Sequence, residues 1–175
     1  RKINLSKNIS LTFYDAKHIP GSSSVLIDFD FNKYDKSVYI TGDIGSGLDN
    51  ILTGMPKKPN EADFVFIEST YGGKLRDLPA NPFDDFFSDL NYSVRSNKIV
   101  WIPCFVLDRT QKVLNSIRRG QHQNKLPKNI DIKVISSTAK KVNKVYDKHY
   151  NYRPKYVDES FSMSPTKLMG EIKNP

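Results

Sequence analysis

Three side chains that could carry chemistry each follow a short apolar run of the sequence. His18 lies in YDAKHIPGSSS, Asp43 in VYITGDIG and Glu68 in FVFIESTYGG, and a further polar turn, PCFVLDRTQ, covers residues 103–111. In α/β architectures, ligands gather outside the carboxyl ends of strands. Imidazole nitrogens and carboxylate oxygens are ligands for zinc and for harder metal ions. Together these residues therefore predict a metal site.

Each of these residues also has a simpler interpretation when it is taken alone. A single histidine is usually a loop residue, and an aspartate in Thr-Gly-Asp favours a turn. A glutamate that precedes Ser-Thr can interact with the N-terminus of a following helix. The combination, and not any one residue, favours the metal site.

Short apolar, β-branched runs alternate with helical patterns along the chain. Strands are expected at residues 9–15, 24–31, 37–41, 63–68, 98–103 and 130–135, and helices at about 82–94, 109–119 and 138–150. From residue 63 the order β-α-β-α-β-α predicts a mainly parallel sheet covered by helices. The earlier strands lie closer together and predict a more antiparallel unit. The sequence thus predicts an α/β chain of two parts, residues 1–60 and 61–175.

The charge of the chain is unevenly distributed. The net charge is +8, and residues 98–156 hold fourteen Lys and Arg against three Asp, whereas residues 1–97 hold eleven basic and thirteen acidic residues. A basic second half is typical of a protein with a polyanionic partner. A lysine-rich, solvated surface would give the same composition, so both interpretations stay open.

Composition also bears on the cellular compartment. Cys104 is the only cysteine, which excludes an intrachain disulfide and a zinc site of several thiolates. We expect it to be a small buried apolar residue in the strand IVWIPCF. No run approaches eighteen apolar residues, so no membrane span is expected. These features predict an intracellular protein of the cytoplasm or nucleus.

Four segments, in this order, resemble motifs of the metallo-β-lactamase superfamily, and specifically of the β-CASP nucleases that process RNA. His18 with Pro20-Gly21-Ser22 resembles the family's GHxxGS segment, and Asp43 lies in a GD strand end. Glu68 opens ESTYG, and IPCFVLDRTQ at residues 102–111 is similar to IPxFxxGRTQ. The resemblance covers about residues 11–150. It implies part of a metallo-β-lactamase αββα core in residues 1–60 and part of a β-CASP domain in residues 61–175.

The resemblance implies a zinc-dependent hydrolase that cleaves RNA phosphodiester bonds with two metal ions. Asp43 would bridge the two zinc ions, His18 would bind one of them, and Glu68 would orient a neighbouring group or shuttle a proton. Arg109, Lys140 and Lys141 are the expected nucleic-acid contacts. For Arg109 a second interpretation stays open, that of a residue at a helix N-terminus that pairs with an acid. The implied partner is RNA, with DNA less favoured and with a second copy or a processing complex as further partners.

The chain departs from the family pattern at several positions. Lys17 and Asp108 replace glycines, and Lys17 would either crowd its turn or add a cation near a phosphate. Asp108 and Gln111 have the spacing of an N-capping box for the following helix. Ile135-Ser136-Ser137 stands where the family has Asp-Ser-Pro, which puts a phosphate contact there in doubt.

The family's first metal cluster, His-x-His-x-Asp-His, does not occur in these 175 residues. The chain also begins without Met, and we expect it to be a piece of a longer protein. Because a catalytic zinc has at least three protein ligands, we expect this piece to bind zinc weakly and to hydrolyse nothing. Two alternatives stay open: a non-catalytic β-CASP subunit that binds RNA or acts as a scaffold, and a DNA nuclease of the same superfamily.

Overall fold

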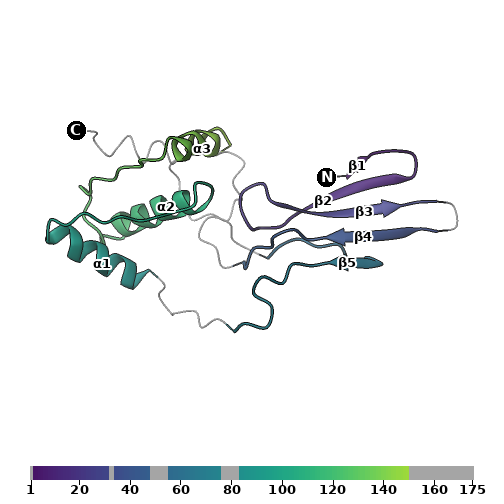
Figure 1. Cartoon of the computed structure of the whole chain (residues 1–175), viewed down its shortest axis with the longest axis horizontal. Coiled ribbons are helices and arrows are strands. Elements are labelled where there is room, and N and C mark those ends of the chain that lie inside the picture. The colour runs from purple at the N-terminus through teal and green to yellow at the C-terminus, as the bar shows by residue number, and fades with distance from the viewer. Residues whose placement is uncertain (1, 32–33, 48–54, 76–82, 150–175) are drawn as a thin grey trace. The chain divides into compact units, whose positions relative to one another are not determined.

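The computed structural model describes residues 2–31, 34–47, 55–75 and 83–149 (Figure 1). The chain forms two compact units, Arg1–Leu75 and Arg76–Pro175. The described residues of the first unit form a five-stranded sheet, and those of the second form three helices. The prediction of a mixed α/β chain is confirmed, while the αββα and β-CASP arrangement of its parts stays a prediction.

The sheet of the first unit has the strand order β1-β2-β3-β4-β5. Its strands are β1 (Lys2–Asn4), β2 (Ile9–Asp15), β3 (Ser23–Phe29), β4 (Lys36–Ile40) and β5 (Phe64–Phe66). The first four strands pair antiparallel in sequence order, and β5 pairs parallel to β4. Val, Ile and Tyr in these runs suit a pleated, half-buried surface, and Leu26 and Tyr39 are buried in it.

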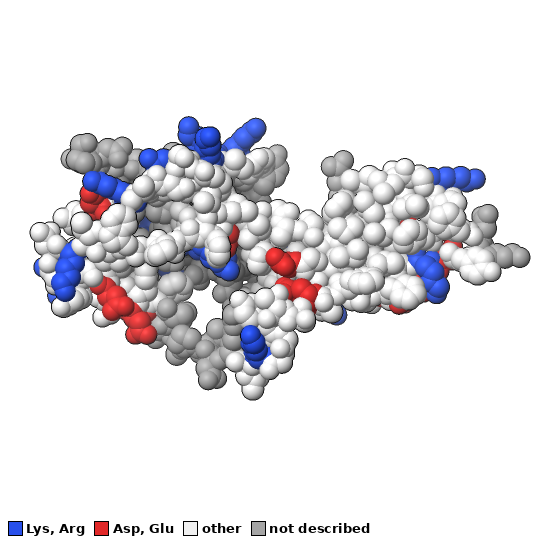
Figure 2. Space-filling model, in the orientation of Figure 1, with Lys and Arg blue, Asp and Glu red and all other residues white. Residues whose placement is uncertain are grey.

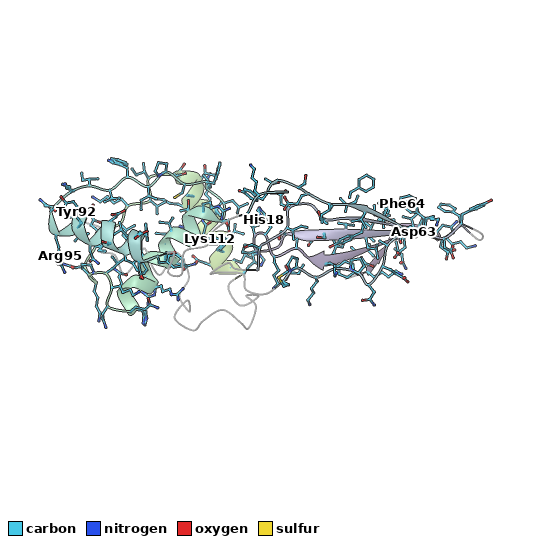
Figure 3. All side chains as sticks on the ribbon, turned by 90° about the horizontal axis from the view of Figure 1, so that it is seen from below. His18, Asp63, Phe64, Tyr92, Arg95 and Lys112 are labelled. Carbon is cyan, nitrogen blue, oxygen red and sulfur yellow. The ribbon has the colours of Figure 1, made fainter. Side chains whose placement is uncertain are left out.

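Strand direction determines which loops share an edge of this sheet. Because β3 is antiparallel to both β2 and β4, these two strands run the same way, and β5 runs with them. Their carboxyl ends therefore lie at one edge, where the chain continues into residues 16–22, 41–47 and 67–75. In Figure 3 His18 lies at this end of the sheet, whereas Asp63 and Phe64 lie at the other end.

The second unit contains α1 (Asp84–Arg95), α2 (Arg109–His122) and α3 (Ser137–Lys148). Its core consists of Phe87 and Leu90 from α1, Ile117 from α2, and Leu126 from the segment that follows α2. Phe87 and Leu90 lie three residues apart and so share one face of α1, as in an amphipathic helix. Gly120 permits a close approach, because a Cβ there would lie 2.7 Å from the Leu126 side chain and 2.8 Å from Phe87.

The strands predicted at residues 98–103 and 130–135 are wrong in this structure, since neither segment forms a ladder within the described residues. A strand is stabilised by backbone pairing with a neighbour, and the apolar side chains Ile99, Trp101 and Ile135 are exposed. Cys104 is exposed as well, not buried as expected. The predicted boundary between residues 60 and 61 stays a prediction about family domains, although β5 pairs with β4 inside the first unit.

Candidate functional site

A tight turn positions His18 just beyond the end of β2. The backbone N–H of Ser22 donates to the carbonyl of Ile19 at 3.0 Å, and Gly21 has a φ of +88°. Pro20 and Gly21 thus occupy the central positions that a type II turn prefers. The Ser22 hydroxyl accepts hydrogen bonds from the N–H groups of His18 and Ile19, at 3.0 and 3.2 Å. The Pro-Gly-Ser segment therefore gives His18 a defined backbone geometry.

The loop after β4 crosses to the segment after β2 and brings Asp43 to His18. The Gly45 N–H donates to the Ala16 carbonyl at 2.8 Å. A Cβ at Gly45 would lie 1.8 Å from the carbonyl oxygen of Lys17, which no side-chain motion could relieve. Only glycine allows this close approach of two backbones.

His18 and Asp43 have the separation of two ligands on one metal ion. The His18 Nε2 atom lies 3.8 Å from the Asp43 Oδ2 atom, and their side chains are 36% and 71% exposed. Two ligands that each lie about 2.0–2.2 Å from a tetrahedral zinc ion are about 3.5 Å apart. The donor types and their spacing therefore fit part of a zinc site. Within the described ranges, no group of three or more His, Cys, Asp or Glu is placed to hold a metal ion.

Glu68 lies at the same edge of the sheet and is hydrogen-bonded to the backbone of the loop that carries Asp43. Its Oε1 atom accepts a 2.6 Å hydrogen bond from the N–H of Ile44, and its own N–H donates to the Thr41 hydroxyl at 3.2 Å. The hydrogen bond from Ile44 is the main cause that lowers the pKa of Glu68, followed by hydrogen bonding to Thr70 and, more weakly, by the charge of His18. Burial opposes these effects. Glu68 is therefore a carboxylate that accepts hydrogen bonds at neutral pH.

Lys17 does not present its ammonium group to solvent. Its side chain is 10% exposed, and Nζ lies 3.1 Å from the Oδ2 atom of Asp15. The backbone of Lys17 has a φ of +57°, in the left-handed region that favours glycine. This conformation explains a glycine at this position of the family pattern. Of the two expectations for Lys17, the structure therefore favours a strained turn over a cation available to a phosphate.

Asp108 and Gln111 do not form the predicted capping box, since no side-chain hydrogen bond from Asp108 caps α2. The φ of Asp108 is +69°, outside the extended region typical of an N-cap. Its Oδ2 atom lies 2.7 Å from Lys112 Nζ and 3.3 Å from Arg109 Nη1. Gln111 is fully buried and donates to the Asn143 side chain of α3 at 2.7 Å. Gln111 therefore links α2 to α3, whereas Asp108 pairs with side chains of α2 itself.

The predicted nucleic-acid contacts lie on exposed surfaces of the second unit. Arg109 begins α2 and pairs with Asp108, while Lys140 and Lys141 are exposed on α3. Figure 2 shows a group of Lys and Arg side chains over α3. Ser136 is the N-cap of this helix, and its hydroxyl accepts a hydrogen bond from the Ala139 N–H at 3.2 Å. This capping hydrogen bond explains why a serine stands at position 136, and no phosphate contact is needed to explain it.

Sequence reasoning missed the residues that hold the site together. The N–H of Ile44 and the hydroxyl of Thr41 both bond to Glu68, and Gly45 permits the close approach of the two loops. The Gly-Asp dipeptide is the only local signal: Thr41 directly precedes it, and Gly45 follows it after Ile44. A backbone N–H carries no sequence signal, so the role of Ile44 required the structure.

Comparison with known proteins finds relatives among RNA-processing enzymes. The chain is 32% identical over 141 residues to an RNase J-like protein of Methanocaldococcus jannaschii, which covers 77% of the chain and 32% of that protein. It is 28% identical to cleavage and polyadenylation specificity factor subunit 3 of Dictyostelium discoideum, over 95% of the chain and 21% of the relative. It is 29% identical to ribonuclease TTHA0252 of Thermus thermophilus, over 87% of the chain and 34% of the relative.

The chain thus spans between about a fifth and a third of the length of these relatives. No protein-family model matches it. In the described part of the chain, none of the helices has the length and apolar character that crossing a bilayer requires.

Proposed function

These relatives indicate that the chain belongs to the β-CASP metallo-β-lactamase family of RNA nucleases, and on that premise we propose that it is part of a zinc-dependent hydrolase that cleaves RNA phosphodiester bonds. One observation carries the proposal. The 3.8 Å pair of His18 and Asp43 lies at the edge where β2, β4 and β5 all end, together with the ionised Glu68. Two relatives are ribonucleases by name, which supports the reaction class.

His18 and Asp43 are the residues of this chain that would hold zinc. The imidazole nitrogen and the carboxylate oxygen suit that ion, and Asp43 is exposed enough to contact a second one. Bound zinc would lower the pKa of a water molecule and stabilise negative charge on phosphate oxygens. Because a catalytic zinc has at least three protein ligands, further ligands would have to complete the site.

Glu68 is best assigned as a positioning residue. A carboxyl group with a lowered pKa is a weak proton donor at neutral pH, which favours the orienting role over the proton-shuttle role. Its bond to the Ile44 N–H holds the residue directly after Asp43. Glu68 would thus fix the orientation of the Asp43 carboxylate.

RNA binding would depend on the basic second unit. Lys140 and Lys141 are exposed on α3 and would attract phosphates without regard to sequence. Arg109 would contribute less, because Asp108 lies beside its guanidinium group. One relative is named as a subunit of a cleavage and polyadenylation factor, which supports a processing complex as a further partner.

The test compares His18→Ala and Asp43→Asn with the control Asp63→Asn in the full-length protein. Asp63 is a matched control because it lies at the opposite end of the same sheet (Figure 3). Cleavage of a labelled RNA is expected to fall at least a hundredfold in both site variants, and zinc content is expected to fall with it. The control is expected to keep both. RNA binding should persist in all three proteins.

Other outcomes would contradict this proposal in different ways. RNA binding without cleavage in the wild-type protein at saturating zinc would favour the non-catalytic subunit. Preferential cleavage of a DNA strand of the same sequence would favour the DNA nuclease. Full activity in Asp43→Asn would remove Asp43 from the metal site.

A further inference from the structure

The sequence that forms α2 and the segment after it is unusually rich in positive charge. Residues 109–130 contain six Lys and Arg and one His, without any Asp or Glu. Lys112 is paired with Asp108, and Lys125 lies 2.8 Å from Asp84. Arg109, at the start of α2, lies 3.3 Å from Asp108 as well. The other basic residues of this stretch lie in the last turns of α2 or beyond it: Arg118, Arg119, His122 and Lys128.

A small pocket lies at that end of α2. Its volume is about 240 Å³, and it is lined by Arg118, Gln121, His122 and Lys128. Arg118, Gln121 and His122 have the spacing i, i+3 and i+4, which places them on one face of the helix. Among the described residues that line the pocket there is no carboxylate. Every side chain of the lining can donate a hydrogen bond.

Gln121 holds the backbone of Lys128, the fourth residue that lines the pocket. Its side-chain amide donates to the carbonyl of Pro127 at 3.1 Å and to that of Lys128 at 3.3 Å. Leu126, directly before this segment, is buried in the core of the unit. The backbone that carries Lys128 is therefore held against α2.

The negative end of the helix dipole does not account for these cations. The last carbonyl groups of a helix attract positive side chains when they have no other donors. Here the carbonyls of Arg119, Gly120 and Gln121 already accept hydrogen bonds from the backbone amides of residues 123–126. The side chains of Arg118, His122 and Lys128 are thus not required as caps.

We propose that this pocket binds a backbone phosphate of the RNA substrate, as a contact additional to Lys140 and Lys141. The inference rests on the proposed RNA substrate. At about 240 Å³ the pocket is smaller than the roughly 300–1,000 Å³ typical of sites for whole small molecules, so it suits one group of a larger ligand. A phosphodiester is such a group, and arginine and lysine are its usual partners.

The experiment measures binding of a single-stranded RNA to the full-length protein by fluorescence anisotropy between 50 and 200 mM salt. Lys128→Gln and His122→Gln are compared with Lys98→Gln, in which an equal charge is lost from a lysine that contacts Tyr92. Each phosphate contact contributes about 0.7 to the salt slope for a single strand. Loss of the Lys128 contact should therefore weaken binding about fivefold at 0.1 M salt and reduce the slope by about 0.7.

His122→Gln is expected to weaken binding by a smaller factor, and Lys98→Gln to leave it unchanged. If Lys128→Gln has the same RNA affinity and salt slope as Lys98→Gln while the wild-type protein binds RNA, the pocket assignment is wrong and the proposed function stands. If the wild-type protein binds no RNA, the proposed function fails too. A titration with inorganic phosphate, monitored through the NMR signals of His122, tests whether the pocket binds a small phosphate compound instead of RNA. Saturation at micromolar phosphate would indicate a site for a small phosphate compound and would overturn the RNA assignment.

Discussion

The close approach of Gly45 to Lys17 determines whether the two metal-ligand candidates meet, so Gly45→Ala is the most direct perturbation of the site. The added Cβ would lie 1.8 Å from the Lys17 carbonyl oxygen and 2.3 Å from its carbonyl carbon. Ordinary contact begins at 3.4 Å, so the two backbones would have to separate by about 1.6 Å. That movement would break the hydrogen bond from the Gly45 N–H to the Ala16 carbonyl.

The expected cost follows from the groups that lose their partners. A lost backbone hydrogen bond costs about 0.5–1.5 kcal/mol, and a buried group left unpaired adds about 1–3 kcal/mol. Gly45→Ala should therefore lower the free energy of unfolding of the first unit by about 2–4 kcal/mol. It should also separate His18 from Asp43 and weaken zinc binding by the full-length protein.

Urea unfolding and zinc titration measure these two effects. The control is Gly73→Ala, because a Cβ there meets nothing within 4 Å and the φ of +70° adds only backbone strain. That strain costs about 1–2 kcal/mol and should leave zinc binding unchanged. The reasoning is refuted if Gly45→Ala loses no more stability than Gly73→Ala and binds zinc like the wild-type protein.

Three further predictions concern stability. Hydrogen bonding to Lys36, and then to Ser37, lowers the pKa of Asp63 from 3.8 to about 2. This contact therefore stabilises the folded state above pH 3.8 and is lost as the pH falls toward 2. Asp63→Asn should remove that acid sensitivity from the unfolding curve, and an unchanged curve would contradict the assignment. Gly120→Ala should lower stability by about 1–3 kcal/mol through overpacking, measured by thermal unfolding; an unchanged melting temperature would contradict the close packing. Gln111→Leu should cost about 1–3 kcal/mol in urea unfolding, because the buried Asn143 loses a donor, and wild-type stability would refute this.

Sequence patterns within a short window predicted most of the helices and strands. Strands β2, β3 and β4 and helices α1, α2 and α3 lie close to their predicted ranges, because alternation and helical periodicity are properties of a short window. The segment at residues 98–103 has the same apolar character as a strand, yet it forms none in the described chain. Its composition indicates a preference for the extended conformation of a strand. A strand forms only when its backbone pairs with a neighbouring strand from elsewhere in the fold.

The candidate site shows the same division. Local sequence is enough to identify the donor types of His18, Asp43 and Glu68 and the Pro-Gly-Ser turn that shapes the backbone at His18. That these side chains lie at one edge of the sheet follows from the fold, since the shared edge depends on strand directions set by pairing between residues far apart in the chain. The fold also decided that Lys17 lies against Asp15 and that Ile44 donates to Glu68. Contacts of this kind depend on distances between loops, which no local spacing of residues specifies.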